Sequence, residues 1–154
     1  MKTRPGSRVF VQNRVGRKGV PLTSSFERWV QASLRGRHQG RRQVNIALFD
    51  ESEARDLNHR FRARNYATNI LSFAYTPLPR ERTELLGDLA ICAPVVAREA
   101  AEQGKPLHHH YAHLTVHGVL HLLGFDHESA ADAAQMEDME RRILAGLNIP
   151  DPYA

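Results

Sequence analysis

Three histidines have the spacing of metal ligands. His117 and His121 are four residues apart, so on a helix their imidazole rings lie on one face, a single turn apart. Gly124 follows, and a glycine in the left-handed conformation can end the helix and reverse the chain, bringing His127 back toward the other two. Three neutral imidazoles can bind one Zn²⁺ and leave its fourth tetrahedral position open, as catalytic zinc sites do. The spacing therefore predicts one zinc ion bound by His117, His121 and His127.

The residue after the first histidine limits the chemistry. Metzincin proteases share this ligand spacing, but there that residue is the glutamate that acts as general base. Here it is Gly118, which has no side chain to accept a proton. Peptide hydrolysis by that mechanism is disfavoured, and a generic zinc hydrolase is kept as an alternative. The base stays open, because Asp126 could orient a ligand or cap the turn, and His113 could line the cleft or be structural.

The elements that must position the histidines alternate between strands and helices. Apolar alternation and β-branched or aromatic runs predict strands at 8–12, 43–49, 68–75 and 87–92, the first of them at an edge. Helical periodicity predicts helices at 25–35, after Asp50, from Pro94 to Gly104, at 107–123 and after Ser129. Asp50 and Ser129 are expected N-caps, and Ser24 with Glu27 has the spacing of a capping box.

This order of elements predicts an α/β (α+β) fold. We expect one domain over 1–154, in which a mixed, mainly parallel four-stranded sheet packs with about five helices. The metal site should lie at the end of a central helix, 107–123. Residues 1–42 would form a basic N-terminal part of the same domain, because they carry eleven Lys or Arg residues and one acid, a net charge of +10. The rest of the chain carries −6, so the total is +4 over 154 residues.

Two further features bear on where the protein works. Cys92 is the single cysteine, so no internal disulfide can form and a reducing compartment is expected. The run 106–125 has no Asp, Glu, Lys or Arg, but six of its residues are histidines, which a lipid-facing helix tolerates poorly. The first ten residues have no apolar core of a secretory signal. We therefore expect a cytoplasmic protein with no membrane partner.

The histidine motif also carries a resemblance. Residues 117–127 fit the pattern H-G-x-L-H-L-x-G-[FYW]-D-H, and from about Val44 onward most of the chain resembles the YbeY family of metal-dependent, single-strand-preferring endoribonucleases. The other matching segments are Leu57-Asn58, Arg62, 68–73, 86–88 and Ala112-His113. The family often has glycine where this chain has Ala63.

The resemblance implies a function and a site. It implies a zinc-dependent, single-strand-specific endoribonuclease of rRNA maturation, including 16S 3′-end processing, and of ribosome quality control. The family's zinc ligands correspond to His117, His121 and His127. Its functionally important arginine corresponds to Arg62, to which we assign phosphate positioning and charge stabilisation in catalysis.

The implied partners are RNA, in the form of rRNA precursors, and a ribosomal subunit or ribosome-associated proteins, with neither DNA nor a membrane. An alternative is a ribosome-assembly factor whose zinc is largely non-catalytic. The basic segments are expected to contact RNA phosphates. The residues chosen for this role are Arg35, Arg37, Arg41 and Arg42.

Overall fold

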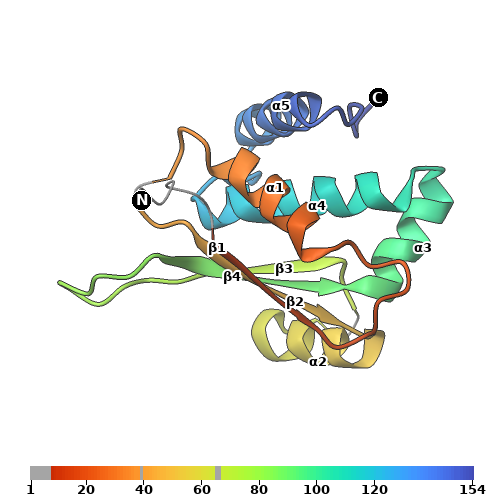
Figure 1. Cartoon of the computed structure of the whole chain (residues 1–154), viewed down its shortest axis with the longest axis horizontal. Helices are drawn as coiled ribbons and strands as arrows, with labels where there is room; N and C mark the ends of the chain where they lie inside the picture. Colours follow the sequence, from red (N-terminus) through yellow and green to blue (C-terminus); the bar gives the residue numbers. More distant parts are fainter. Residues whose placement is uncertain (1–7, 39, 65–66) are drawn as a thin grey trace.

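The computed structural model describes residues 8–38, 40–64 and 67–154 and is built on one sheet (Figure 1). Its strands are β1 (Arg8–Asn13), β2 (Gln43–Phe49), β3 (Ile70–Ala74) and β4 (Leu85–Cys92). They lie in the order β1-β2-β4-β3. β1, β2 and β4 are parallel, and β3 runs antiparallel to β4 at the edge. The predicted mixed, mainly parallel sheet is confirmed, with the first strand at the opposite edge.

The described residues form five helices, as predicted: α1 (Thr23–Leu34), α2 (Glu51–Arg62), α3 (Ala93–Gln103), α4 (Leu107–Leu122) and α5 (Ala130–Gly146). Figure 1 shows α1, α4 and α5 on one side of the sheet and α2 on the other. α4 is the central helix, because it contacts α1, α3, α5, β3 and β4. Within the described residues, no helix combines the length and the apolar character needed to cross a membrane.

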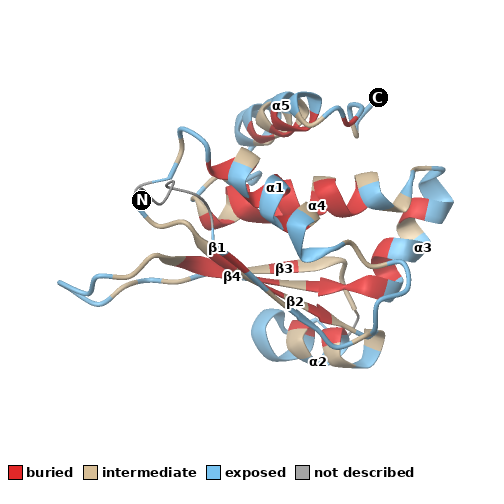
Figure 2. Ribbon diagram, viewed as in Figure 1, coloured by how far each residue is buried: buried red, intermediate tan, exposed pale blue. Residues whose placement is uncertain are grey.

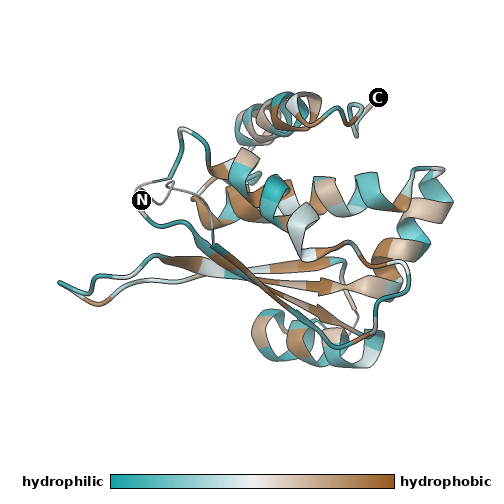
Figure 3. Cartoon of the chain, in the orientation of Figure 1, coloured by the Kyte–Doolittle hydropathy of each residue, from teal (hydrophilic) through white to brown (hydrophobic). Residues whose placement is uncertain are grey.

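The core lies where α1 and α4 face the sheet. Val44, Ile46 and Leu48 are buried along β2, because alternate side chains of a strand point to the same face. They pack in one cluster with residues such as Trp29 of α1 and Leu120 of α4. Figure 2 shows the buried residues concentrated in this layer, and Figure 3 shows that the same layer is the most hydrophobic.

One stripe of side chains along α4 is partly exposed to solvent. Most of this helix is buried, but His113, His117 and His121 are only half-buried. They follow one another at intervals of four, so they form one stripe along the helix. The packing of α4 against its neighbours therefore leaves these histidines accessible to a ligand.

The helix ends explain two confirmed predictions and one error. Asp50 accepts a hydrogen bond from the Glu53 amide at 2.8 Å, and Ser129 accepts one from Asp132 at 3.0 Å, so both are N-caps as predicted. The capping box at Ser24 is wrong. Leu22 is the N-cap of α1, since its carbonyl already accepts the first helical bonds, and Ser24 lies inside the first turn.

Candidate metal centre

The three predicted ligands lie together at the end of α4. Each offers a ring nitrogen, and these nitrogens are all within 4.8 Å of one another. Nε2 of His117 and Nε2 of His121 are 3.1 Å apart. The ring centroid of His127 lies 5.7 Å from that of His117 and 5.0 Å from that of His121. In the described part of the chain, this group could hold a metal ion.

Gly124 brings His127 to the helix. Its φ of +98° lies in the left-handed region, which glycine adopts without strain. The turn is closed by a hydrogen bond of 3.0 Å from the Phe125 amide to the Leu120 carbonyl. Asp126 accepts a hydrogen bond from the His127 amide at 2.7 Å. Asp126 was considered either as a residue that orients a ligand or as a cap of the turn, and this contact corresponds to the cap.

The donor set fits a divalent cation that prefers nitrogen. Ligands about 2.05 Å from a tetrahedral zinc ion are about 3.3 Å from each other, close to the observed separation of the His117 and His121 nitrogens. Burial, followed by the nearby His117 and His127 rings, lowers the pKa of His121. A lowered pKa favours the neutral imidazole, and a neutral ring has the lone pair that binds a metal.

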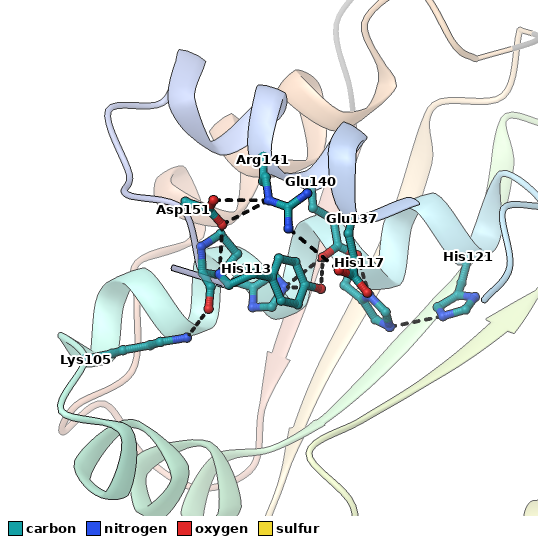
Figure 4. Close-up of polar contacts among 10 residues, drawn as sticks. Lys105, His113, His117, His121, Glu137, Glu140, Arg141 and Asp151 are labelled. Carbon is teal, nitrogen blue, oxygen red and sulfur yellow. Dashed lines mark hydrogen bonds and ion pairs between the residues drawn. The ribbon is translucent and has the colours of Figure 1, made fainter. Parts of the chain in front are cut away.

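Glu140 of α5 is a residue that sequence reasoning missed. Its side chain is fully buried, yet it contacts Nδ1 of His117 at 2.6 Å and Nε2 of His113 at 2.8 Å (Figure 4). The Tyr153 hydroxyl donates to the same carboxylate. Burial raises the pKa of Glu140, but these three hydrogen bonds and the electrostatic attraction of His117 outweigh it and lower the pKa to about 2. The carboxylate is therefore ionised at neutral pH.

A signal for Glu140 was present in the sequence. The buried line of α5 runs through Met136, Glu140, Ile143 and Leu144, so an acid occupies a position that periodicity marks as apolar. Charged residues are almost never fully buried unless they are paired. His113 takes both roles considered for it, because it pairs with Glu140 and also lines the pocket beside the ligands.

The histidines open into a pocket of about 630 Å³ along the edge strand β3. Arg62, at the end of α2, lines the same pocket. Its guanidinium donates to the Ser72 carbonyl of β3 at 3.2 Å and lies over the Phe73 ring, 5.3 Å from the centroid. The structure therefore brings the predicted arginine to the predicted ligands, although 55 positions separate Arg62 from His117.

Two small residues near the pocket have structural explanations. Ala63, where the family often has glycine, adopts φ 54° and ψ 31°, a left-handed conformation that ends α2. Gly118 faces the sheet, and a Cβ there would lie 2.8 Å from side-chain atoms of Ile70 and Leu89. The absence of a protease-type glutamate at 118 is thus also a requirement of packing.

The four arginines expected to contact RNA do not gather in one place. Arg35 and Arg37 line a groove of about 450 Å³ between α1 and α5, with Arg28 and Arg142. Arg41 instead donates to the carbonyls of Tyr75 and Leu85, at 2.8 and 3.3 Å. The fourth, Arg42, pairs with Glu84 at 3.6 Å.

A pocket that could hold a metal ion on three histidines, beside an arginine at the edge of an α/β sheet, is the kind of site that metal-dependent hydrolases use. The family model described as Endoribonuclease YbeY matches residues 11–148. The chain therefore belongs to the YbeY family, whose members are named as enzymes that cleave RNA internally.

Individual relatives agree. A protein of Alkalilimnicola ehrlichii named Endoribonuclease YbeY is 56% identical over 140 residues, covering 89% of this chain and 84% of that protein. Its namesake in Xanthomonas axonopodis pv. citri is 55% identical over 150 residues, covering 95% and 92%. A solution structure from Thermotoga maritima has the same fold, with a TM-score of 0.59, 23% identity and 91% of each chain covered.

Proposed function

We propose that this protein is a zinc-dependent endoribonuclease that cleaves single-stranded segments of rRNA precursors, including the 3′ end of 16S rRNA. The observation that carries the proposal is the shared pocket. The three histidines and Arg62 come from different parts of the chain, yet they line one cavity together with residues of β3. Membership of an endoribonuclease family supports RNA as the substrate.

The histidines and Arg62 have different roles in the proposed reaction. His117, His121 and His127 would hold the ion, which when bound supplies Lewis acidity and lowers the pKa of water. Arg62 would bind a non-bridging phosphate oxygen, and its fixed positive charge would stabilise the negative charge that grows in the transition state. The contact with Ser72 orients the guanidinium along the strand and limits its freedom before RNA arrives.

Cleavage of a defined single-stranded RNA by zinc-loaded protein tests the proposal. Arg62→Ala should lower kcat by about 10²–10³, because it removes one donor to the transition state. Its zinc content should be unchanged. His117→Ala should lose both zinc and cleavage. Arg55→Ala removes an exposed arginine from the same helix, outside the pocket, and should cleave like the wild type.

The same preparations distinguish a contaminating nuclease from the proposed one. Cleavage that persists unchanged in Arg62→Ala and His117→Ala would refute the site. If His117→Ala still supports 16S 3′-end maturation in cells that lack the wild-type protein, the alternative of an assembly factor with non-catalytic zinc would be favoured. Co-sedimentation of His117→Ala with small ribosomal subunits tests the proposed association with the ribosome in the cytoplasm.

The arginine groove is the proposed route for the rest of the RNA. Arg28, Arg35, Arg37 and Arg142 line it, and no acid lies among its lining residues, although Arg142 pairs with the neighbouring Asp138 at 3.0 Å. A groove of one sign attracts the opposite charge, and single-stranded RNA presents one phosphate per nucleotide. Arg41 and Arg42 are expected to contribute less to RNA binding, because their guanidinium groups already contact the β3–β4 region.

A further inference from the structure

We propose that Glu140, held in place by Tyr153, is a positioning residue that sets the proton and the ring orientation of the metal ligand His117. The inference deepens the proposed function and rests on it, because it concerns the same metal centre. It adds two residues outside the ligand triad, and one of them belongs to the segment after α5.

Glu140 and His117 share one hydrogen bond. Oε2 of Glu140 lies 2.6 Å from Nδ1 of His117, and a carboxylate oxygen in such a contact accepts from the ring N–H. Nδ1 must therefore carry the proton in the neutral ring, which leaves the lone pair on Nε2. That is the nitrogen 3.1 Å from His121, on the side where the ligands converge. A carboxylate behind a ligating histidine fixes its tautomer and increases its basicity.

The Glu140 carboxylate is buried without a permanently charged partner among the described residues. Glu140 is 0% exposed, and its hydrogen-bond partners in the described structure are two imidazoles and a phenol. None of these carries a permanent positive charge. A buried carboxylate is stable only when it is paired or coupled to a cation. A dication on the far side of His117 would supply that charge through the ring.

Several contacts hold Tyr153 in place. Its amide donates to Asp151 at 2.8 Å, and Asp151 also accepts from Arg141 Nε at 3.1 Å. The Arg141 guanidinium lies over the Tyr153 ring, 5.2 Å from the centroid. Lys105 donates to the Pro152 carbonyl at 2.7 Å (Figure 4). These contacts tie residues 151–153 to α5 and to the turn between α3 and α4, so the hydroxyl reaches Glu140 from a fixed direction.

Zinc affinity is the first test, measured on the full chain with zinc alone against a chromogenic competing chelator. Glu140→Gln should weaken zinc binding about 10–100-fold. Tyr153→Phe removes one donor to Glu140 without touching His117 and should weaken binding about fivefold. Glu137→Gln is the matched control, since it makes the same change one turn earlier on α5, where Glu137 pairs with Arg141 at 3.8 Å.

The second test reads the tautomer directly in zinc-free protein. Long-range ¹⁵N–¹H correlation spectra should show His117 with its proton on Nδ1 in the wild type and in Glu137→Gln. Glu140→Gln should show a mixture of tautomers, because the amide can donate as well as accept. A purely structural role for Glu140 would not change this signature. If Glu140→Gln does not fold, Tyr153→Phe and the wild-type spectrum still decide.

The two proposals can fail separately. Unchanged zinc affinity in Glu140→Gln and Tyr153→Phe, or a wild-type His117 protonated on Nε2, overturns the positioning role even if the wild type cleaves RNA. The opposite outcome is also possible to recognise. If the wild type binds zinc as expected, both variants bind it more weakly, and the wild type cleaves no RNA, the positioning role is upheld and the nuclease proposal is refuted.

Discussion

Nδ1 of His117 lies 2.6 Å from Oε2 of Glu140, although the two residues are 23 positions apart and belong to different helices. The orientation of a candidate metal ligand therefore depends on how α5 packs against α4. The stripe of half-buried histidines on α4 faces α5 at this point, so a change in the interface between the two helices reaches the site without touching a ligand.

Zinc should stabilise the folded protein. A ligand that binds only the native state at 100 times its Kd adds about 2.7 kcal/mol. For a chain of this size, that corresponds to a rise in Tm of about 5–10 °C. Differential scanning calorimetry with and without zinc checks the rise, and a chelator should reverse it. His121→Ala should show little shift, and an equal shift in that variant would contradict binding by the triad.

Gly87→Ala should destabilise the sheet beside the pocket. A Cβ at this position would clash with the Phe73 carbonyl and lie 2.7 Å from Leu122 Cδ2. Because the carbonyl belongs to the backbone of β3, it cannot rotate away, and we expect a loss of about 3 kcal/mol or more in urea unfolding. Gly146→Ala, whose Cβ meets nothing within 4 Å, is the control and should not lose stability. Equal stability of both variants would contradict the close approach of β3 and β4.

Ala63→Gly should stabilise the protein. Ala63 ends α2 in the left-handed conformation, which costs a residue with a Cβ about 1 kcal/mol or more and costs glycine little. The free energy of unfolding in urea should rise by about 1 kcal/mol. Ala145→Gly, at an exposed position within α5, should instead lower the free energy of unfolding by about 0.5–1 kcal/mol. A loss in both variants would show that residue 63 is not left-handed in solution.

Stability should fall at high pH because of Tyr111. Burial raises the pKa of this phenol to about 12, above the value of about 10 in an unfolded chain. A raised pKa means that the folded state holds the proton more tightly, so the stabilisation is complete below pH 10 and is lost between pH 10 and 12. The loss is about 2–3 kcal/mol. Tyr111→Phe should show a shallower decline in urea unfolding over this range, and curves parallel to the wild type would contradict the assignment.

RNA binding should depend steeply on salt. With about four phosphates contacted, log affinity should fall against log salt concentration with a slope near −3. His117→Ala is the binding form to use, because it should not cleave. Adding Arg28→Glu and Arg35→Glu should reduce the slope by about 1.4, at −0.7 per contact. Adding Arg55→Glu on α2 is the control, and if it reduces the slope as much, RNA does not follow the α1–α5 groove.

Local features of the sequence were enough to predict the elements. The strand alternation at 43–49, the caps Asp50 and Ser129, and the stop at Gly124 all depend on neighbouring residues in the chain, and the structure confirms them. The convergence of His117, His121 and His127 could be predicted for the same reason, because one helical turn and one glycine bring them together. Ser24 was misassigned because a cap depends on where the helix begins, and Leu22 begins it.

Contacts between distant segments were decided only by tertiary structure. Glu140 reaches His117 because α5 packs across α4, and Arg62 enters the pocket because α2 ends beside the edge strand β3. The same packing separates Arg35 and Arg37 from Arg41 and Arg42, which the sequence places within eight positions. Periodicity reports which face of an element is buried. It does not report which other element covers that face, because burial is non-directional and the partner is chosen by the packing of the whole core.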